Sequence, residues 1–523
     1  MLFNSYIFIF AFLPITLAGW YILNKLNKCK LSLAFLTGMS LWFYGYFNIS
    51  YLWIIVLSML GNYAISAILG HFERMNPTEE ESETATCKKN NENAGIPAKI
   101  RIIRRISMVA GVILNLGILF YYKYFDFFIE NINALFGSSF NLRNILLPLG
   151  ISFFTFQQLS YIIDRAWGKA DHYSFLDYAA FVTFFPQLVA GPIVLHTELV
   201  PQFHNYHKKS FDPDMFYDGI VSFVIGLSKK VLLADTLAVI ANYGFDNARL
   251  LDTFSTICIL IAYSLELYFD FSGYSDMAIG LGYMFGIKLP VNFNSPYKSR
   301  SLKELWGRWH ITLTRFMTTY LYIPLGGNRK GRVRTLINIF IVFLFSGLWH
   351  GSAWTYVVWG ALTGIIVVWD NLGIIGFNPN EKRPARIILP GWLGVIFTNI
   401  AFTGLLIPFR SDNLTTAAEL LKNFTKGWTG NFPKMVDATV KFPETYVLDQ
   451  IFTKIAPQYL TITHIIYIVL LLALGIFIMT RKNVAEIVES YRGRRFLNIF
   501  VVLLLVYCII SFSQVSTFIY FNF

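Results

Sequence analysis

Residues 336–369 decide the fold and read LINIFIVFLFSGLWHGSAWTYVVWGALTGIIVVW. This stretch holds no Lys, Arg, Asp or Glu. Each half approaches the length of about 20 apolar residues that a helix needs to cross a bilayer, so the pattern predicts a membrane hairpin that turns near Gly351. One ionisable side chain, His350, lies between the two apolar runs. Because an ionisable group at membrane depth is costly, His350 is a candidate functional residue.

The composition extends this prediction to the whole chain. Of the 523 residues, 55% are hydrophobic, 17% are aromatic and only 14% are charged, whereas soluble domains carry roughly 25% charged residues. We therefore expect an all-α polytopic membrane protein with about 10–12 transmembrane helices, and with re-entrant or interfacial helices in the middle of the chain. Outside the central region, the candidate spans are residues 6–23, 31–47, 51–69, 106–122, 146–163, 388–407, 465–479 and 499–512.

The basic residues predict an orientation. The formal net charge is +12, and basic residues that flank membrane helices mark the cytoplasmic side. By this rule residues 25–30, 72–105, 382–386 and 481–495 are cytoplasmic, and the segment 410–461 is extracytoplasmic. The loop 72–105 is polar and low in aromatic residues, so we expect it to be a flexible cytoplasmic loop without chemistry. We treat residues 1–523 as a single membrane-embedded domain.

The densest basic stretch, residues 298–334, has two interpretations. It holds nine cations and a single acid, Glu304. The first reading is positive-inside anchoring with contact to anionic lipid, at ~1 kcal/mol per basic residue. The second is that some cations hold the phosphates of a cytoplasmic donor such as coenzyme A, with Lys298, Arg300, Arg308 and Arg315 as candidates. Nucleic acid is excluded as a partner, because the charges adjoin membrane segments and no nucleic-acid-binding fold is indicated.

The predicted orientation places His350 at a defined depth in the membrane. A helix that begins at Thr335 on the cytoplasmic side places His350 about 22 Å along its axis, which is less than the roughly 30 Å thickness of the hydrocarbon. A donor could therefore reach His350 from inside and an acceptor from outside. Imidazole has an ordinary pKa of about 6.5, which suits general-base activation of a hydroxyl.

Other polar residues are weaker candidates. His310 either belongs to the site or serves local structure, and Asp270 and Asp276 either orient a histidine or, as we favour, pair with Lys or Arg. On a continuous helix these two aspartates face different sides. We expect Lys229 and Lys230 to be interfacial, and we expect tryptophans to shape the site or to anchor the chain at the interface. No chemistry is assigned to His71, His172, His196, His204, His207 and His464. The four cysteines have no metal-binding or disulfide spacing, so no metal site is predicted.

Taken together, eight blocks of sequence resemble the membrane-bound O-acyltransferase (MBOAT) family, in its bacterial branch that includes the alginate O-acetyltransferase membrane subunit. The blocks extend over essentially the whole chain, and they are specific only in combination. They are MLFNS (1–5), LPLGISFFTFQ (147–157), FFPQLVAGPI (184–193), GLSKKVLLAD (226–235), YFDFSGYSDMA (268–278), RWHI (308–311), YLYIPLGGNR (320–329) and GLWHG (347–351).

The resemblance implies a helical core around a central tunnel, with catalytic histidines at His350 and His310. The residues themselves make Asp270, Asp276, Trp309 and Trp349 candidates to line the tunnel or to orient the histidines. The resemblance also implies transfer of an acyl group from a cytoplasmic thioester donor to an acceptor outside the cytoplasm. We take the group as acetyl, the donor as acetyl-CoA or another acyl thioester, and the acceptor as a polysaccharide or a partner protein, with no bound cofactor. The location would be a bacterial cytoplasmic (inner) membrane. A partner acetyltransferase outside is expected because no serine-nucleophile motif is present.

Two alternatives stay open at this stage. One is D-alanyl transfer from a carrier protein to teichoic acid, which differs in its donor. The other is a proton-coupled glycan exporter, against which the lack of a visible inverted repeat counts.

Overall fold

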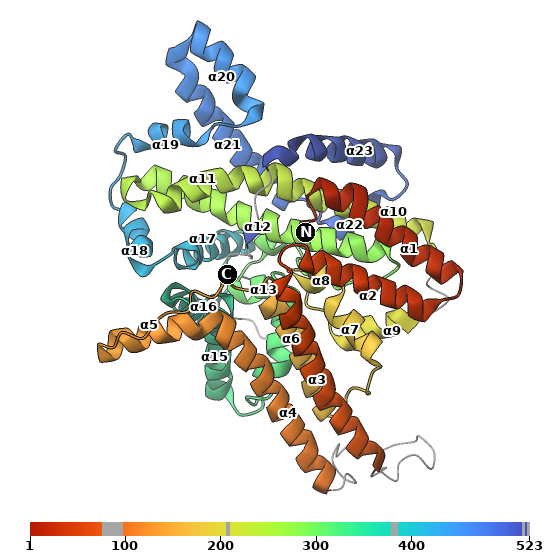
Figure 1. Cartoon of the computed structure of the whole chain (residues 1–523). Coiled ribbons are helices and arrows are strands. Elements are labelled where there is room, and N and C mark those ends of the chain that lie inside the picture. Colours follow the sequence, from red (N-terminus) through yellow and green to blue (C-terminus); the bar gives the residue numbers. More distant parts are fainter. Residues whose placement is uncertain (76–97, 205–209, 378–384, 515–517, 520–523) are drawn as a thin grey trace. The chain divides into compact units, whose positions relative to one another are not determined.

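The computed structural model describes residues 1–75, 98–204, 210–377, 385–514 and 518–519 (Figure 1). By its internal contacts the chain divides into two compact units. Unit 1 comprises Met1, residues 12–212 and residues 285–288, and unit 2 comprises the remainder. Whether the two units act as the single domain predicted from the sequence stays a prediction.

Unit 1 is helical. A π-helical turn, Phe120–Tyr124, joins two of its helices. The helices of this unit are α1 (Leu13–Lys25), α2 (Cys29–Gly45), α3 (Ser50–Met75), α4 (Ala98–Leu119), α5 (Phe125–Phe136), α6 (Ile151–Ala166), α7 (Phe175–Thr183), α8 (Phe185–Leu188) and α9 (His196–His204).

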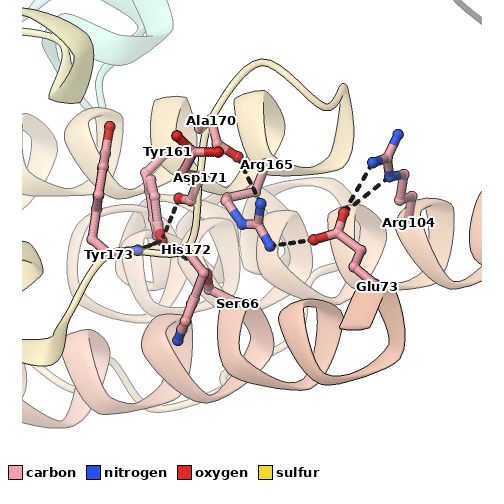
Figure 2. A network of polar contacts seen from close by, with 9 residues as sticks. All are labelled: Ser66, Glu73, Arg104, Tyr161, Arg165, Ala170, Asp171, His172 and Tyr173. Atoms are coloured by element: carbon pink, nitrogen blue, oxygen red, sulfur yellow. Dashed lines mark hydrogen bonds and ion pairs between the residues drawn. The ribbon is translucent and has the colours of Figure 1, made fainter. Parts of the chain in front are cut away.

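Buried polar side chains tie α3, α4 and α6 together. Asn62 and Asn115 exchange hydrogen bonds of 3.2 and 2.6 Å, and Asn62 also donates to Gln158 at 2.9 Å. At the ends of the same helices, Glu73 accepts from both Arg104 and Arg165 (Figure 2). Buried polar groups are tolerated when they are hydrogen-bonded in this way, so these contacts fix how the three helices pack.

Unit 2 is also helical, apart from a short parallel pairing of Ile375–Gly376 (β1) with Ile387–Ile388 (β2). A π-helical turn, η5 (Lys229–Ala234), joins its first two helices. The helices are α10 (Pro213–Ser228), α11 (Asp235–Asp246), α12 (Thr253–Met284), α13 (Leu302–Trp306), α14 (Ile311–Met317), α15 (Arg332–His350), α16 (Trp354–Leu372), α17 (Gly391–Arg410), α18 (Leu414–Asn423), α19 (Asn431–Thr439), α20 (Pro443–Ile455), α21 (Leu460–Met479), α22 (Val484–Tyr491) and α23 (Arg495–Ile510).

Small residues let the central helices approach closely. α12 packs along α10, and a Cβ atom built on Gly226 would lie 2.6 Å from the carbonyl oxygen of Gly273. The α15–α16 hairpin uses the same device, since a Cβ on Gly347 would lie 2.9 Å from the Cα of Gly360. Helices in membranes associate through such small residues. The hairpin predicted from residues 336–369 is therefore a closely packed pair that turns at Gly351.

The predicted all-α polytopic membrane fold is confirmed. In the described part of the chain, eight helices are long and apolar enough to cross a membrane, and two of them are α15 and α16. The expected 10–12 spans included 31–47, 146–163 and 499–512, which form α2, α6 and α23, helices of only 17, 16 and 16 residues. α6 begins late because Pro148 and the left-handed Gly150 precede it.

The predicted loop 72–105 needs a correction. Helix α3 continues to Met75 and α4 begins at Ala98, so both ends of this segment are helical. The physical reason is the ion pairing of Glu73 and Arg104, which orders the helix ends. Residues 76–97 lie outside the described residues.

Candidate active site

His350 is the last residue of α15. Its Nδ1 lies 2.6 Å from the carbonyl oxygen of Ser346, one helical turn earlier. A carbonyl oxygen only accepts hydrogen bonds, so Nδ1 carries the proton in the neutral ring and Nε2 is the basic nitrogen. Gly351 follows in an extended conformation and ends the helix. The backbone of α15 thus fixes both the tautomer and the direction of the imidazole.

Aromatic rings surround the His350 imidazole. The ring centroids of Trp349, Trp359 and Phe409 lie 4.8, 4.9 and 5.4 Å from it, all in edge-to-face arrangements. His350 is only 5% exposed. Edge-to-face packing is the preferred geometry of aromatic pairs, so these contacts hold the imidazole in one position and keep bulk water away from it.

His310 has an unusual backbone. It precedes α14 with φ 45° and ψ 51°, the left-handed region that non-glycine residues seldom adopt. Its Nδ1 lies 3.2 Å from Oδ1 of Asn292, which also accepts from the backbone N–H and the hydroxyl of Thr312. These bonds make Nδ1 the protonated nitrogen of His310 as well. Strained backbone of this kind occurs at functional sites, and here Asn292 and Thr312 maintain it.

Trp349 links the two histidines. Its ring centroid lies 6.2 Å from that of His310 and 4.8 Å from that of His350. Burial, followed by the neighbouring His350, holds the pKa of His310 well below its ordinary value. His310 is therefore neutral at physiological pH. Trp309 packs against Phe293 and Phe402.

Asp270 and Asp276 pair with lysines, as favoured from the sequence. Asp270 lies 2.7 Å from Lys230, and Asp276 lies 2.6 Å from Lys229. The expectation that the lysines are interfacial is wrong. The π-helical turn η5 directs both toward α12, where their carboxylate partners compensate the cost of burial. Burial alone would lower the pKa of Lys230, but Asp270 and Asp235 outweigh it and raise that pKa above its ordinary value.

A basic cavity of about 1040 Å³ lies at the end of the hairpin where α15 begins and α16 ends. We define the basic cavity by the charged residues in its lining, which are Arg300, Lys303, Glu304, Arg332, Asp370 and Arg386. Cations outnumber acids there. Arg300 is thus the one predicted donor-binding residue that lines this cavity.

The other three predicted donor-binding residues lie elsewhere. Lys298 donates to the carbonyl oxygen of Arg481 at 2.8 Å, and Arg308 pairs with Glu304 at 3.0 Å. Arg315 lies half-buried on α14. Their role in donor binding stays a prediction.

A second cavity, of about 530 Å³, lies at the opposite end of the hairpin. We call it the α12 cavity, because Glu266 and Asp270 of α12 line it together with Lys230, Tyr356 and Arg410. The 19 residues of α15 span about 28 Å, so the hairpin separates the two cavities by most of a bilayer thickness. His350 lies at the α12-cavity end. A continuous tunnel between them stays a prediction.

Sequence reasoning missed three polar residues of this region. Glu266 precedes Asp270 by four residues, so helical periodicity could have placed both on one face of α12. The sequence does not mark Asn292 or Arg410 as site residues. Asn292 follows a short apolar stretch, and Arg410 ends a long one. In the described residues, no group of three or more His, Cys, Asp or Glu side chains could hold a metal ion.

Two histidines without assigned chemistry lie within hydrogen-bond distance of carboxylates. His196 lies 3.1 Å from Asp164 and accepts or donates at Tyr173, 2.9 Å away. His464 contacts Asp437 at 2.9 Å and Asp449 at 3.0 Å, joining α19, α20 and α21. Both have structural roles in holding helices together. His207 lies outside the described residues.

Comparison with known proteins identifies the family. A model described as the MBOAT, membrane-bound O-acyltransferase, family matches residues 165–407. The peptidoglycan O-acetyltransferase of Helicobacter pylori is 38% identical over 454 residues, covering 81% of this chain and 79% of that protein. The chain belongs to the membrane-bound O-acyltransferase family. It is therefore a multi-pass membrane acyltransferase.

Other relatives of this MBOAT chain act on different polymers by name. The probable alginate O-acetylase AlgI of Pseudomonas aeruginosa is 37% identical over 425 residues, covering 80% of this chain and 73% of that protein. A teichoic acid D-alanyltransferase of Bacillus subtilis is 28% identical over 271 residues, covering 50% of this chain and 67% of that protein. Membership of an acyltransferase family argues against the proton-coupled glycan exporter. It does not identify the acyl group or the acceptor.

The pH dependence of activity tests whether His310 takes part in the chemistry. In Asn292→Asp, a carboxylate replaces the amide that accepts from His310. A nearby negative charge raises a histidine pKa by about 1–3 units. Because the pKa of His310 starts well below its ordinary value, a required neutral His310 predicts a kcat that falls below wild type in the acidic range, where the raised pKa allows His310 to be protonated. A profile that stays at the wild-type position would limit His310 to a structural role.

Proposed function

We propose that this protein transfers an acetyl group from cytoplasmic acetyl-CoA, across the membrane, to a hydroxyl of an extracytoplasmic polysaccharide or of a partner protein. The proposal includes a location in the bacterial cytoplasmic membrane. Its main support is the position of His350, buried at one end of a membrane hairpin that has a basic cavity at its other end.

The two ring nitrogens of His350 have different roles in the proposed reaction. The Nδ1–H group of His350 donates to the carbonyl oxygen of Ser346. Nε2 of His350 removes the proton from the acceptor hydroxyl. The hydroxyl oxygen attacks the thioester carbonyl carbon, and the carbon–sulfur bond then breaks. The coenzyme A thiolate leaves and takes the proton from the imidazolium. The net result is an O-acetyl ester and free coenzyme A.

The basic cavity supports coenzyme A as donor. Coenzyme A carries phosphates, and arginine binds phosphate through charge-assisted, bidentate hydrogen bonds. The part of the lining that the structure describes holds four cations, Arg300, Lys303, Arg332 and Arg386, against Glu304 and Asp370. A D-alanyl carrier protein is the competing donor, supported by the Bacillus subtilis relative. Such a donor would dock on the surface around the cavity instead of filling it with a nucleotide.

Removing one cavity charge tests the donor. In Arg300→Gln we expect the KM for acetyl-CoA to rise about 10-fold, because a hydrogen bond to a charged group contributes about 1.5–3 kcal/mol. The kcat should stay near wild type, since the contact is made equally in ground and transition states. Arg329→Gln is the matched control, because Arg329 is an exposed cation of the same basic stretch outside the cavity lining. Equal KM values for both variants would argue against acetyl-CoA in this cavity.

We also propose that a partner acetyltransferase docks on segment 410–461. Helix α20 of this segment exposes three apolar side chains at helical spacing, Val447, Ile451 and Ile455, which are 63%, 45% and 78% exposed. Residues four apart share one face of a helix, so these side chains form a single apolar stripe. Such a stripe suits a protein contact.

A further inference from the structure

The α12 cavity has a buried floor and an exposed mouth. Glu266 and Asp270 at the floor are 3% and 1% exposed, whereas the side chain of Asp412 is 82% exposed. Asn242 and Asp246 of α11 are also exposed at the lining. The cavity therefore opens outward from α12, and a solute from the surrounding water can enter it.

The charges of this cavity are unfavourable for an anion. Among the described residues, five carboxyl groups line it, against two cations. Lys230 is paired with both Asp235 and Asp270, at 2.7 Å each, and Arg410 lies 3.6 Å from Asp412. Both cations in the described lining are thus already engaged by carboxylates. A polyanion placed here would face like charges, which costs several kcal/mol.

Glu266 provides an unmet hydrogen-bonding site on the floor. Within the described residues, its Oε2 atom is buried and has no hydrogen-bond partner. A buried carboxyl without a partner is costly unless a ligand supplies one. Hydroxyl groups are the uncharged donors that meet this requirement. In the same lining, Arg410 donates to Oδ1 of Asn242 at 2.9 Å, and Tyr356 contributes an aromatic ring.

The cavity lies next to the reacting histidine. Tyr356 lines the cavity and packs over Gly351, since a Cβ atom on Gly351 would lie 2.0 Å from the Tyr356 ring. The Tyr356 ring contacts Phe409 at a centroid distance of 5.5 Å, and Phe409 contacts His350 at 5.4 Å. A ligand hydroxyl in the cavity is therefore separated from His350 by the side chains of Tyr356 and Phe409.

We propose that the α12 cavity is a subsite for the acceptor, which holds an uncharged, hydroxyl-rich sugar unit next to the unit that reacts at His350, with Glu266 accepting a sugar hydroxyl. This inference rests on the proposed function and narrows its acceptor. Polyuronates and polyphosphates are excluded by the carboxyl-rich lining. Glu266 is the residue that we expect to select for a ligand with hydroxyl groups.

Binding of defined oligosaccharides tests the inference. The protein, purified in lipid nanodiscs, is titrated calorimetrically with chitotriose, an uncharged trisaccharide, and with trigalacturonate, an anionic one of equal length. We expect chitotriose to bind at least 10-fold more tightly than trigalacturonate. In Glu266→Gln we expect about 5- to 10-fold weaker chitotriose binding, because the amide has one oxygen where the carboxyl has two, and a hydrogen bond contributes about 0.5–1.5 kcal/mol. Glu489→Gln, an exposed position on α22, is the control and should bind as wild type.

Three results would overturn the inference. They are equal binding of both trisaccharides, no chitotriose binding to the wild type, and chitotriose binding unchanged in Glu266→Gln. Saturable Ca²⁺ binding that disappears in Glu266→Gln, without any sugar binding, would instead assign the cavity to a cation. The His350→Ala variant distinguishes this inference from the proposed function. It should bind chitotriose like the wild type, although it should lose acetyl transfer. Wild-type protein that binds chitotriose but transfers no acetyl group would contradict the proposed function alone.

Discussion

Replacing His350 with alanine is expected to lower acetyl transfer by about 10²- to 10⁴-fold, the usual contribution of a general base. The loss should appear in kcat, because the imidazole acts on the hydroxyl proton in the transition state. The protein should still fold. The removed ring is one of several in its aromatic cluster, and Trp359 and Phe409 also contact each other directly, at a centroid distance of 5.0 Å. The measurement is release of coenzyme A and formation of O-acetyl ester by purified protein.

His71→Ala is the matched control for this experiment. His71 is an exposed histidine near the end of α3, and it has no place in the proposed site. We expect wild-type activity from it. If His350→Ala retained more than a tenth of the wild-type kcat while folding normally, His350 could not be the base that activates the acceptor.

Replacing Lys229 with methionine is expected to destabilise the protein by about 3–5 kcal/mol, the cost of leaving a buried charge without its partner. Lys229 lies 2.6 Å from Asp276, and both side chains are largely buried between η5 and α12. Methionine keeps the length of the side chain, so the lost charge dominates the effect. Unfolding in mixed micelles with increasing denaturing detergent measures the change.

The double variant Lys229→Met, Asp276→Leu provides the control. Replacing both partners of a buried ion pair by apolar residues is often neutral or stabilising, so most of the lost stability should return. A double variant as unstable as Lys229→Met alone would show that packing, not the unpaired carboxylate, causes the loss.

The hairpin and its histidine were predictable because their signals are local. An apolar run of known length predicts a membrane helix, and an ionisable residue within it is conspicuous. Residues 336–369 therefore gave α15, α16 and the position of His350 from the sequence alone. The pairing of Asp270 and Asp276 with basic residues was predicted on the same physical ground, the cost of burying a charge.

Features that depend on tertiary contacts were not predictable. Lys229 and Lys230 follow an apolar segment and resemble an interfacial anchor, but the π-helical turn directs them into the protein. The left-handed backbone of His310 depends on Asn292, 18 residues away in the chain. His196 and His464 find their carboxylate partners across helices, so no spacing along the sequence reveals them.

Labelling of sealed membrane vesicles tests the central claim most directly. Inside-out and right-side-out vesicles, prepared from cells that make the acetylated polysaccharide, each receive radiolabelled acetyl-CoA in the external medium. The account predicts label on polysaccharide enclosed in the inside-out vesicles, none in the right-side-out vesicles, and none in either preparation from His350→Ala cells. Equal labelling in both orientations, or labelling that persists without His350, would contradict transfer through this hairpin.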